Sequence, residues 1–75
     1  MKVIIREEVK LGSGMNIDVY EYEDEYQLGK RVDEEANWFN KVHIPIDEME
    51  VYDDEAIICG GDYSISYYVK EVERR

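Results

Sequence analysis

Two side chains in this sequence are typical of nucleophilic catalysis, a single histidine (His43) and a single cysteine (Cys59). A Cys–His dyad needs both side chains within hydrogen-bonding distance, so that the imidazole can take the thiol proton. The local patterns oppose this, because His43 alternates with residues expected to face inward and Cys59 directly precedes the Gly60-Gly61 turn. We therefore expect a solvent-facing His43, a structural Cys59 and no enzymatic activity.

Carboxylates are the second group that could do chemistry. Residues 47–50 and 53–55 hold the oxygen ligands that calcium prefers, but the spacing of an EF-hand loop with its central glycine is absent. One histidine and one cysteine supply half a zinc site at most. We expect neither a metal site nor a cofactor.

The charge of the chain limits its partners. Nineteen acidic residues against nine basic ones give a net charge of −10, and residues 11–69 hold fifteen of the acids and three of the bases. Nucleic-acid binding needs clustered Lys and Arg, and an anionic membrane would repel the chain. The acidity fits a basic protein partner, for example an enzyme that itself binds nucleic acid. The alternative is that the acidic residues only keep the chain soluble.

Seven tyrosines are the other unusual feature. Tyrosine beside carboxylates makes a good protein-contact surface, because the ring buries area while its hydroxyl keeps a hydrogen bond. The alternative is that tyrosine is simply a good strand former. The predicted protein-binding residues are acids and tyrosines near the expected strand ends: Glu21, Tyr22, Glu23, Asp24, Glu25, Asp53, Asp54, Glu55 and Tyr68.

Three of these acids, Glu21, Glu23 and Glu25, would stand on one face of an extended strand at intervals of about 6.6 Å. This interval is comparable to the scale on which phosphates repeat. In size and charge the chain resembles the small phage and mobile-element proteins that inhibit enzymes by mimicking DNA, without a motif of any one family. We expect a non-enzymatic acidic protein-binding module of this kind. The alternative is a structural or accessory subunit that self-associates through its β edge or tyrosine-rich face.

The element that organises the fold is a hairpin over residues 56–69. Two strand-like runs flank Gly60-Gly61-Asp62, which is a strong signal for a two-residue turn. Either position of the turn places the same side chains on one apolar face: Ala56, Ile58, Tyr63, Ile65, Tyr67 and Val69.

A second hairpin is predicted over residues 3–11 and 15–22, joined by Gly12-Ser13-Gly14. Its alternation places the odd apolar residues toward the core, including Met15, Ile17 and Val19, and directs Tyr20 and Tyr22 away. Residues 26–28 and 42–46 are predicted as short strands, the latter limited by the proline at position 45. Residues 47–52 fit either a strand or a single helical turn.

Residues 33–40 are the one helix candidate, with Asp33 as N-cap and with Trp38 and Phe39 packing on the sheet. An irregular loop anchored by Trp38 is the alternative. The fold class is mainly β, or α+β if residues 33–40 are helical. We expect one domain over residues 1–75, a small antiparallel sheet or partial barrel of five or six short strands with at most one short helix.

Cysteine usage and hydropathy predict the compartment. A lone cysteine excludes an intramolecular disulfide, and neither a leader peptide nor an apolar run long enough to cross a membrane is expected. These features indicate a cytoplasmic protein. The tail over residues 70–75 is expected to extend the last strand and then fray.

Overall fold

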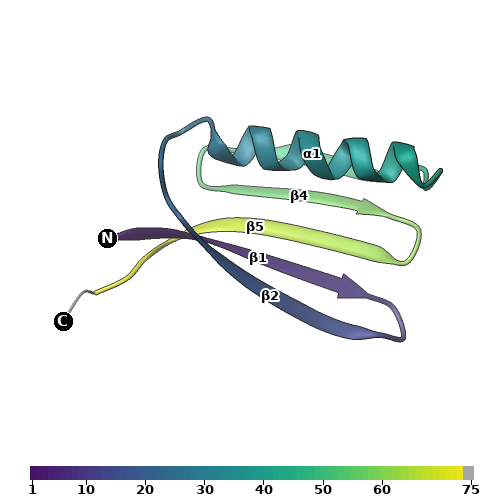
Figure 1. Cartoon of the computed structure of the whole chain (residues 1–75), viewed down its shortest axis with the longest axis horizontal. Helices are drawn as coiled ribbons and strands as arrows, with labels where there is room; N and C mark the ends of the chain where they lie inside the picture. Colours follow the sequence, from purple (N-terminus) through teal and green to yellow (C-terminus); the bar gives the residue numbers. More distant parts are fainter. Residues whose placement is uncertain (74–75) are drawn as a thin grey trace.

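The computed structural model describes residues 1–73 and shows five antiparallel strands and one helix (Figure 1). The elements in chain order are β1 (Lys2–Lys10), β2 (Gly14–Glu21), α1 (Gln27–Lys41), β3 (Glu48–Val51), β4 (Glu55–Gly60) and β5 (Tyr63–Glu71). The strands form one sheet in the order β2-β1-β5-β4-β3, so the first and last strands are neighbours. The predicted mainly β class is confirmed. The predicted tail extends β5 as far as Glu71, and its end, residues 74–75, lies outside the described residues.

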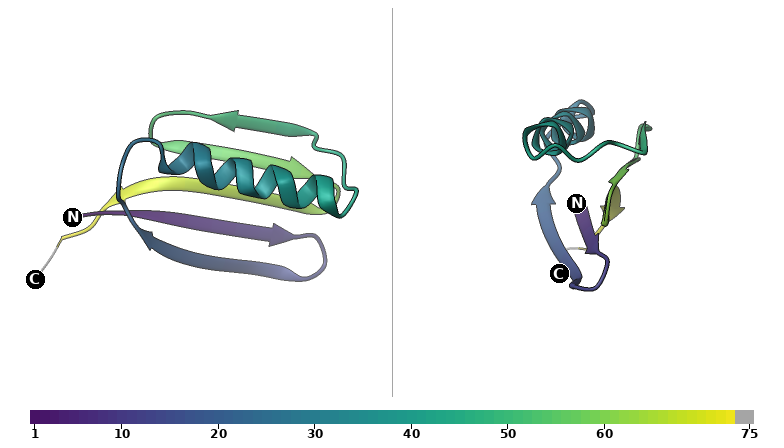
Figure 2. Two further views of the ribbon diagram at one scale, coloured as in Figure 1. Left: turned by 45° about the horizontal axis from the view of Figure 1, so that its top comes forward. Right: turned by 90° about the vertical axis from the view of Figure 1, so that its right-hand side faces the viewer.

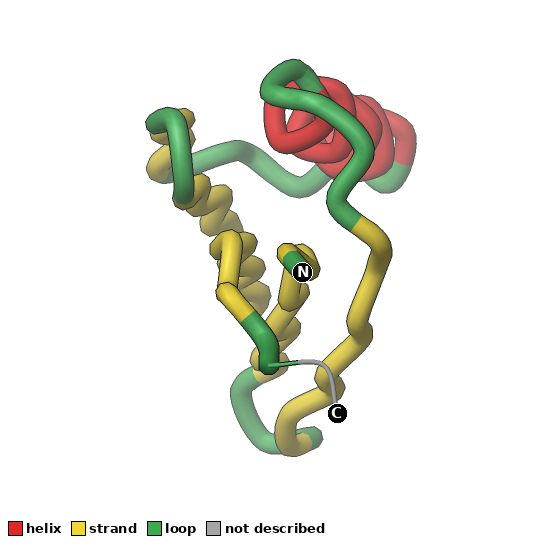
Figure 3. Tube along the Cα trace, turned by 90° about the vertical axis from the view of Figure 1, so that its left-hand side faces the viewer, coloured by secondary structure: helices red, strands yellow, loops and turns green. Residues whose placement is uncertain are grey.

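The sheet is covered on one side only. Figure 2 shows it curled, with α1 lying across the concave side, and Figure 3 shows the same two layers from the opposite end. We call the concave side the helix-covered face and the other side the open face. Since neighbouring residues of a strand point to opposite sides, each strand contributes to both faces.

The predicted hairpin over residues 56–69 is confirmed as β4 and β5, with Gly60 opposite Tyr63 across the turn. Gly61 takes a positive φ of 55° there, and a Cβ on Gly60 would collide with the backbone oxygen of Pro45. The predicted apolar side of this hairpin faces α1. Together with β1 and α1 it forms the core: Ile4, Leu28, Val32, Phe39, Ala56, Ile58, Ile65 and Tyr67.

The helix is longer than predicted and begins earlier. It starts at Gln27, so residues 26–28, predicted as a strand, form its beginning. Its N-cap is Tyr26, without a side-chain cap, and Asp33 lies inside the helix. The buried positions Leu28, Val32 and Phe39 fall on one side of the helix, since they are separated by four and seven residues. Burial of this stripe therefore sets the helix start.

The predicted strand over residues 42–46 is wrong. The chain turns back after α1, with the backbone N–H of Ile44 donating to Phe39 O at 2.9 Å, and His43 takes a positive φ of 62°. Ile44 and Ile46 pack at the border of the core. A short strand follows as β3, which decides the alternative left open for residues 47–52.

The β1–β2 hairpin is confirmed, but its two faces are the reverse of those predicted. Tyr20 and Tyr22 pack against the core, whereas Met15, Ile17 and Val19 point to the open face and are 57–62% exposed. The cause is the pairing of β1 with β5, which sets Ile4 beside Val69 on the helix-covered face. Because Tyr20 is opposite Ile4 on β2, the even positions of β2 must share that face.

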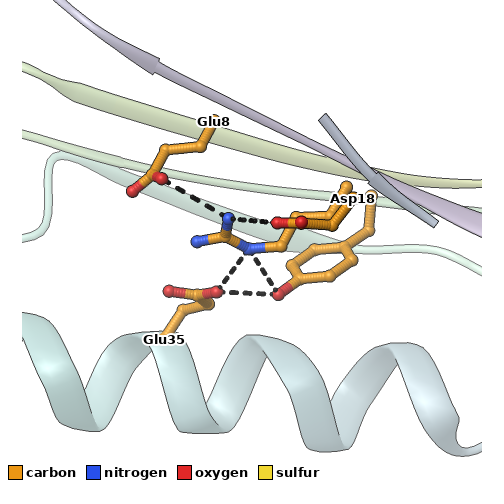
Figure 4. A network of polar contacts seen from close by, with 5 residues as sticks. Glu8, Asp18 and Glu35 are labelled. Carbon is orange, nitrogen blue, oxygen red and sulfur yellow. Dashed lines mark hydrogen bonds and ion pairs between the residues drawn. The ribbon is translucent and has the colours of Figure 1, made fainter. Parts of the chain in front are cut away.

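One polar network ties β1 to α1 across the helix-covered face (Figure 4). Arg6 Nε donates to Glu35 Oε1 at 2.8 Å, and the same oxygen accepts the Tyr67 hydroxyl at 2.7 Å. Glu8 and Asp18 each lie 3.5 Å from Arg6 Nη1. The guanidinium thus bridges the gap between the helix and the β1 side of the sheet.

Candidate protein-binding site

Two segments far apart in sequence meet at the end of the sheet nearest the N-terminus (Figures 1 and 2). One is the loop from β2 to α1 and the other is the turn from β3 to β4. Two surface hollows of about 330 Å³ each are lined by Glu25 and Asp53 together. Tyr22, Asp54 and Lys2 also line one of them, whereas tyrosines 26 and 52 line the other. We call residues 21–26 and 50–55 the acidic end.

The β2–α1 loop is held in shape by hydrogen bonds of Gln27, which follows it, and of Asp24 within it. Gln27, which is buried, donates from Nε2 to Glu21 O at 2.8 Å and accepts from the backbone N–H of Glu23 at 2.7 Å. Asp24 Oδ1 accepts the backbone N–H of Tyr26 at 2.9 Å. These bonds fix the backbone while Glu23 and Glu25 remain exposed.

The ladder of carboxylates that an extended strand over residues 21–25 would give does not form. β2 ends at Glu21, and the hydrogen bonds of Gln27 and Asp24 fold the next residues into a loop. Glu23 and Glu25 therefore do not continue a strand with a regular spacing of phosphate-like charges. The acids are gathered by the loop and the neighbouring turn instead.

A third hollow, of about 290 Å³, extends the acidic end onto the open face. Its lining includes Glu50, Tyr52, Glu55 and Tyr68. A hydrogen bond to Glu50 and the charge of that carboxylate raise the pKa of Tyr52. Tyr68 donates its hydroxyl to Glu7 Oε1 at 3.1 Å, and this bond raises the Tyr68 pKa. Both phenols therefore keep their protons at neutral pH.

Positive groups border the acidic end without neutralising it. The N-terminal amine lies 2.9 Å from Glu71 Oε1 and lowers the pKa of that carboxyl group. Lys2 Nζ lies 5.5 Å from the centre of the Tyr22 ring. The acidic end itself holds eight carboxylates and no Lys or Arg. Its local field therefore remains negative.

Four of the nine predicted binding residues line the two shared hollows: Tyr22, Glu25, Asp53 and Asp54. Glu55 and Tyr68 lie opposite each other on β4 and β5 and line the third hollow. The other three, Glu21, Glu23 and Asp24, are neighbours of Tyr22 and Glu25 in sequence but line none of these hollows. Sequence reasoning missed Glu50, Tyr26 and Tyr52. The two tyrosines had a visible signal, since each directly adjoins an acidic residue that was predicted.

The residues considered for catalysis lie in different surroundings. Cys59 Sγ lies 3.4 Å from Ser64 Oγ on the sheet, whereas His43 is exposed in the turn after α1. Among residues 1–73, no group of three His, Cys, Asp or Glu side chains is arranged to hold a metal ion. Within the same residues, no helix has the length and apolar character needed to cross a membrane.

No protein family, curated protein or solved structure matches this chain. Its function is therefore inferred from the chemistry and geometry of the acidic end.

Proposed function

We propose that this chain is a non-enzymatic, cytoplasmic protein-binding module whose acidic end contacts a basic surface of another protein. The observation that carries the proposal is the meeting of two acidic segments around shared hollows lined by tyrosines. Two exposed rings, Tyr26 and Tyr52, supply apolar contact area beside the carboxylates. Aromatic anchors within a charged rim are typical of protein interfaces.

The hollow lined by tyrosines 26 and 52 suits a long basic side chain. The aliphatic stem of Lys or Arg packs against an aromatic ring while its charged head reaches a carboxylate at the rim. In the hollow with tyrosines 26 and 52, Glu25 and Asp53 supply those carboxylates. The hydrogen bonds of Gln27 hold the loop in place before binding, which reduces the entropy cost of association.

The partner class we propose is a protein that itself binds nucleic acid, because such proteins carry clustered Lys and Arg. Occupation of that basic surface would inhibit the partner by excluding its nucleic acid. This form of the proposal is supported by the charge of the acids and by their clustering at one end of the sheet. It does not rest on a phosphate-like spacing, because the acids do not continue along β2.

The test is capture of proteins from a lysate of the source cells on the immobilised full chain, followed by titration of the purified captured protein. The test variant combines Glu25→Lys with Asp53→Lys. The matched control combines Glu34→Lys on α1 with Asp62→Lys in the β4–β5 turn, so both variants change the net charge equally. We expect the test variant to weaken binding about tenfold or more at low salt, and the control to weaken it much less.

Salt provides the second readout. Binding between the acidic end and a basic surface must weaken as salt screens the charges, most steeply below about 0.2 M. Equal losses in the two variants would show that net charge alone acts, and affinity independent of salt would remove the electrostatic mechanism. Either result would overturn the proposed site.

A further inference from the structure

The outer edge of β2 is a second surface that is built to be covered. β2 has eight residues and stands at the end of the sheet, so its outer side has no partner strand among residues 1–73. Long exposed edges readily pair with another chain, and proteins usually protect them with short strands, charges or proline. The opposite edge, β3, is protected in this way, since it has only four residues and two of them are glutamates.

The backbone of β2 presents free pairing groups at its apolar positions. Tyr22 N donates to Lys2 O, which makes that pair a hydrogen-bonded one in the β1–β2 ladder. In antiparallel strands every second residue repeats this pattern, so the even residues of β2 bond to β1. The N–H and C=O groups of Met15, Ile17 and Val19 must therefore point to the outer edge.

We infer that the occupant of this edge is a second copy of the chain, paired antiparallel through β2 about a two-fold axis at Ile17. The sequence around Ile17 is symmetric in type, since apolar and polar residues alternate equally on both sides. In this register Ile17 faces its own copy and Met15 faces Val19. Three such pairs exchange about six backbone hydrogen bonds between the copies.

The charges also favour this register over one with the axis at Asp18. Asn16 of one copy faces Asp18 of the other, so an amide meets a carboxylate at the closest side-chain positions. A shift of the axis to Asp18 would set two carboxylates against each other. Asp18 is already near Arg6 of its own chain, at 3.5 Å, which reduces its repulsion toward a second copy. A two-fold pairing closes after two chains, so the product is a dimer.

This dimer contact does not involve the acidic end. Its strength and its response to salt differ from those of the proposed binding of a basic partner. One pair of strands makes an interface below about 1,200 Å², typical of weak complexes. Each chain also carries a charge of −10, so the copies repel one another. Because salt screens this repulsion, dimerisation strengthens as salt rises, whereas the proposed binding of a basic partner weakens.

The test is sedimentation equilibrium of the full chain from about 5 to about 500 µM, the range expected for a small interface. We expect a monomer–dimer equilibrium that shifts toward dimer between about 0.05 and about 0.5 M salt. Ile17→Lys places two ammonium groups together at the axis and should abolish the dimer. As the matched control, Met49→Lys on the opposite edge of the sheet makes the same change in net charge and should not weaken the dimer.

Asn16→Lys tests the register, because it sets an ammonium group opposite Asp18 in the other copy. It should strengthen the dimer about threefold to tenfold, more than Asp62→Asn, which makes the same change in net charge at the β4–β5 turn. The inference is overturned by a wild-type monomer over the whole range at both salt concentrations. Assemblies larger than a dimer, or equal effects of Ile17→Lys and Met49→Lys in chains shown to be folded by circular dichroism, would also overturn it.

Discussion

The two faces of the β1–β2 hairpin have opposite surroundings, and the open face carries more of the apolar side chains than the helix-covered face. On the helix-covered face, Ile4 is fully buried and Arg6 is bonded to Glu35 of α1. On the open face, Ile17 and Val19 are more than half exposed although they are also β-branched strand formers. Alternation along one strand thus identifies two faces without indicating which of them is buried.

The difference between the faces arises because a single helix can bury only one side of the sheet. A chain of 75 residues has enough apolar surface for one small core, and α1 supplies the second layer of that core on one side only. On the open face, the apolar residues of β2 therefore stay exposed. This division gives the protein a stabilising face, an acidic end and an edge with unpaired backbone groups.

The largest effect is expected when one apolar side chain is removed from each face and the losses of stability are compared. Phe39 on α1 is completely buried, so Phe39→Ala should lower the free energy of unfolding by about 3 to 5 kcal/mol. Val19→Ala on the open face should cost below about 1 kcal/mol. Urea unfolding at low micromolar protein, where the proposed dimer is dissociated, measures both, and similar losses would contradict the assignment of the faces.

Local signals in the sequence were sufficient to predict the two hairpins, because the turn glycines and the alternation of apolar and polar residues act within a few residues. The apolar face of β4 and β5 was predicted from residues 56–69 alone, whereas the register was left open between two positions of the turn. The orientation of Tyr20 and Tyr22 was not, because it depends on the pairing of β1 with β5 across almost the whole chain. The helix start was missed because Gly29, a poor helix former, and the polar Lys30-Arg31 pair separate Leu28 from the rest of the helix in sequence.

The candidate site was predictable in its parts but not in its assembly. Residues 21–25 and 53–55 stand out by composition. Their meeting at shared hollows depends on the β2–α1 loop, which leads from one edge of the sheet to the start of α1 beside β3 and β4 (Figure 1). The contribution of Tyr52 to two hollows follows from that same placement.

A smaller effect is expected from the polar link between β1 and α1. Arg6→Met leaves Glu35 in a largely buried position without its cation and should lower stability by about 1 to 3 kcal/mol. Combining it with Glu35→Leu removes the unpaired charge and should recover part of the loss, as measured by thermal or urea unfolding. A double variant as unstable as Arg6→Met would show that the guanidinium acts by packing rather than by pairing.

The smallest effect is expected in how the free energy of unfolding depends on pH under alkaline conditions. Burial and the hydrogen bond to Glu35 raise the pKa of Tyr67 above its ordinary value, whereas Arg6, which also faces the hydroxyl, lowers it by a lesser amount. Above about pH 10 the unfolded chain releases this phenolic proton while the folded chain retains it, so stability must fall as pH rises. One such group contributes a slope of at most about 1.4 kcal/mol per pH unit.

Tyr67→Phe should therefore flatten the loss of stability between about pH 10 and pH 11.5, even though it removes a hydrogen bond at neutral pH. The matched variant Tyr68→Phe acts on the open face, where the hydroxyl is bonded to Glu7 at the surface. Because its surroundings are solvated, it should leave most of the slope in place. Urea midpoints measured at each pH distinguish the two, and equal flattening would show that both faces exclude water to the same extent.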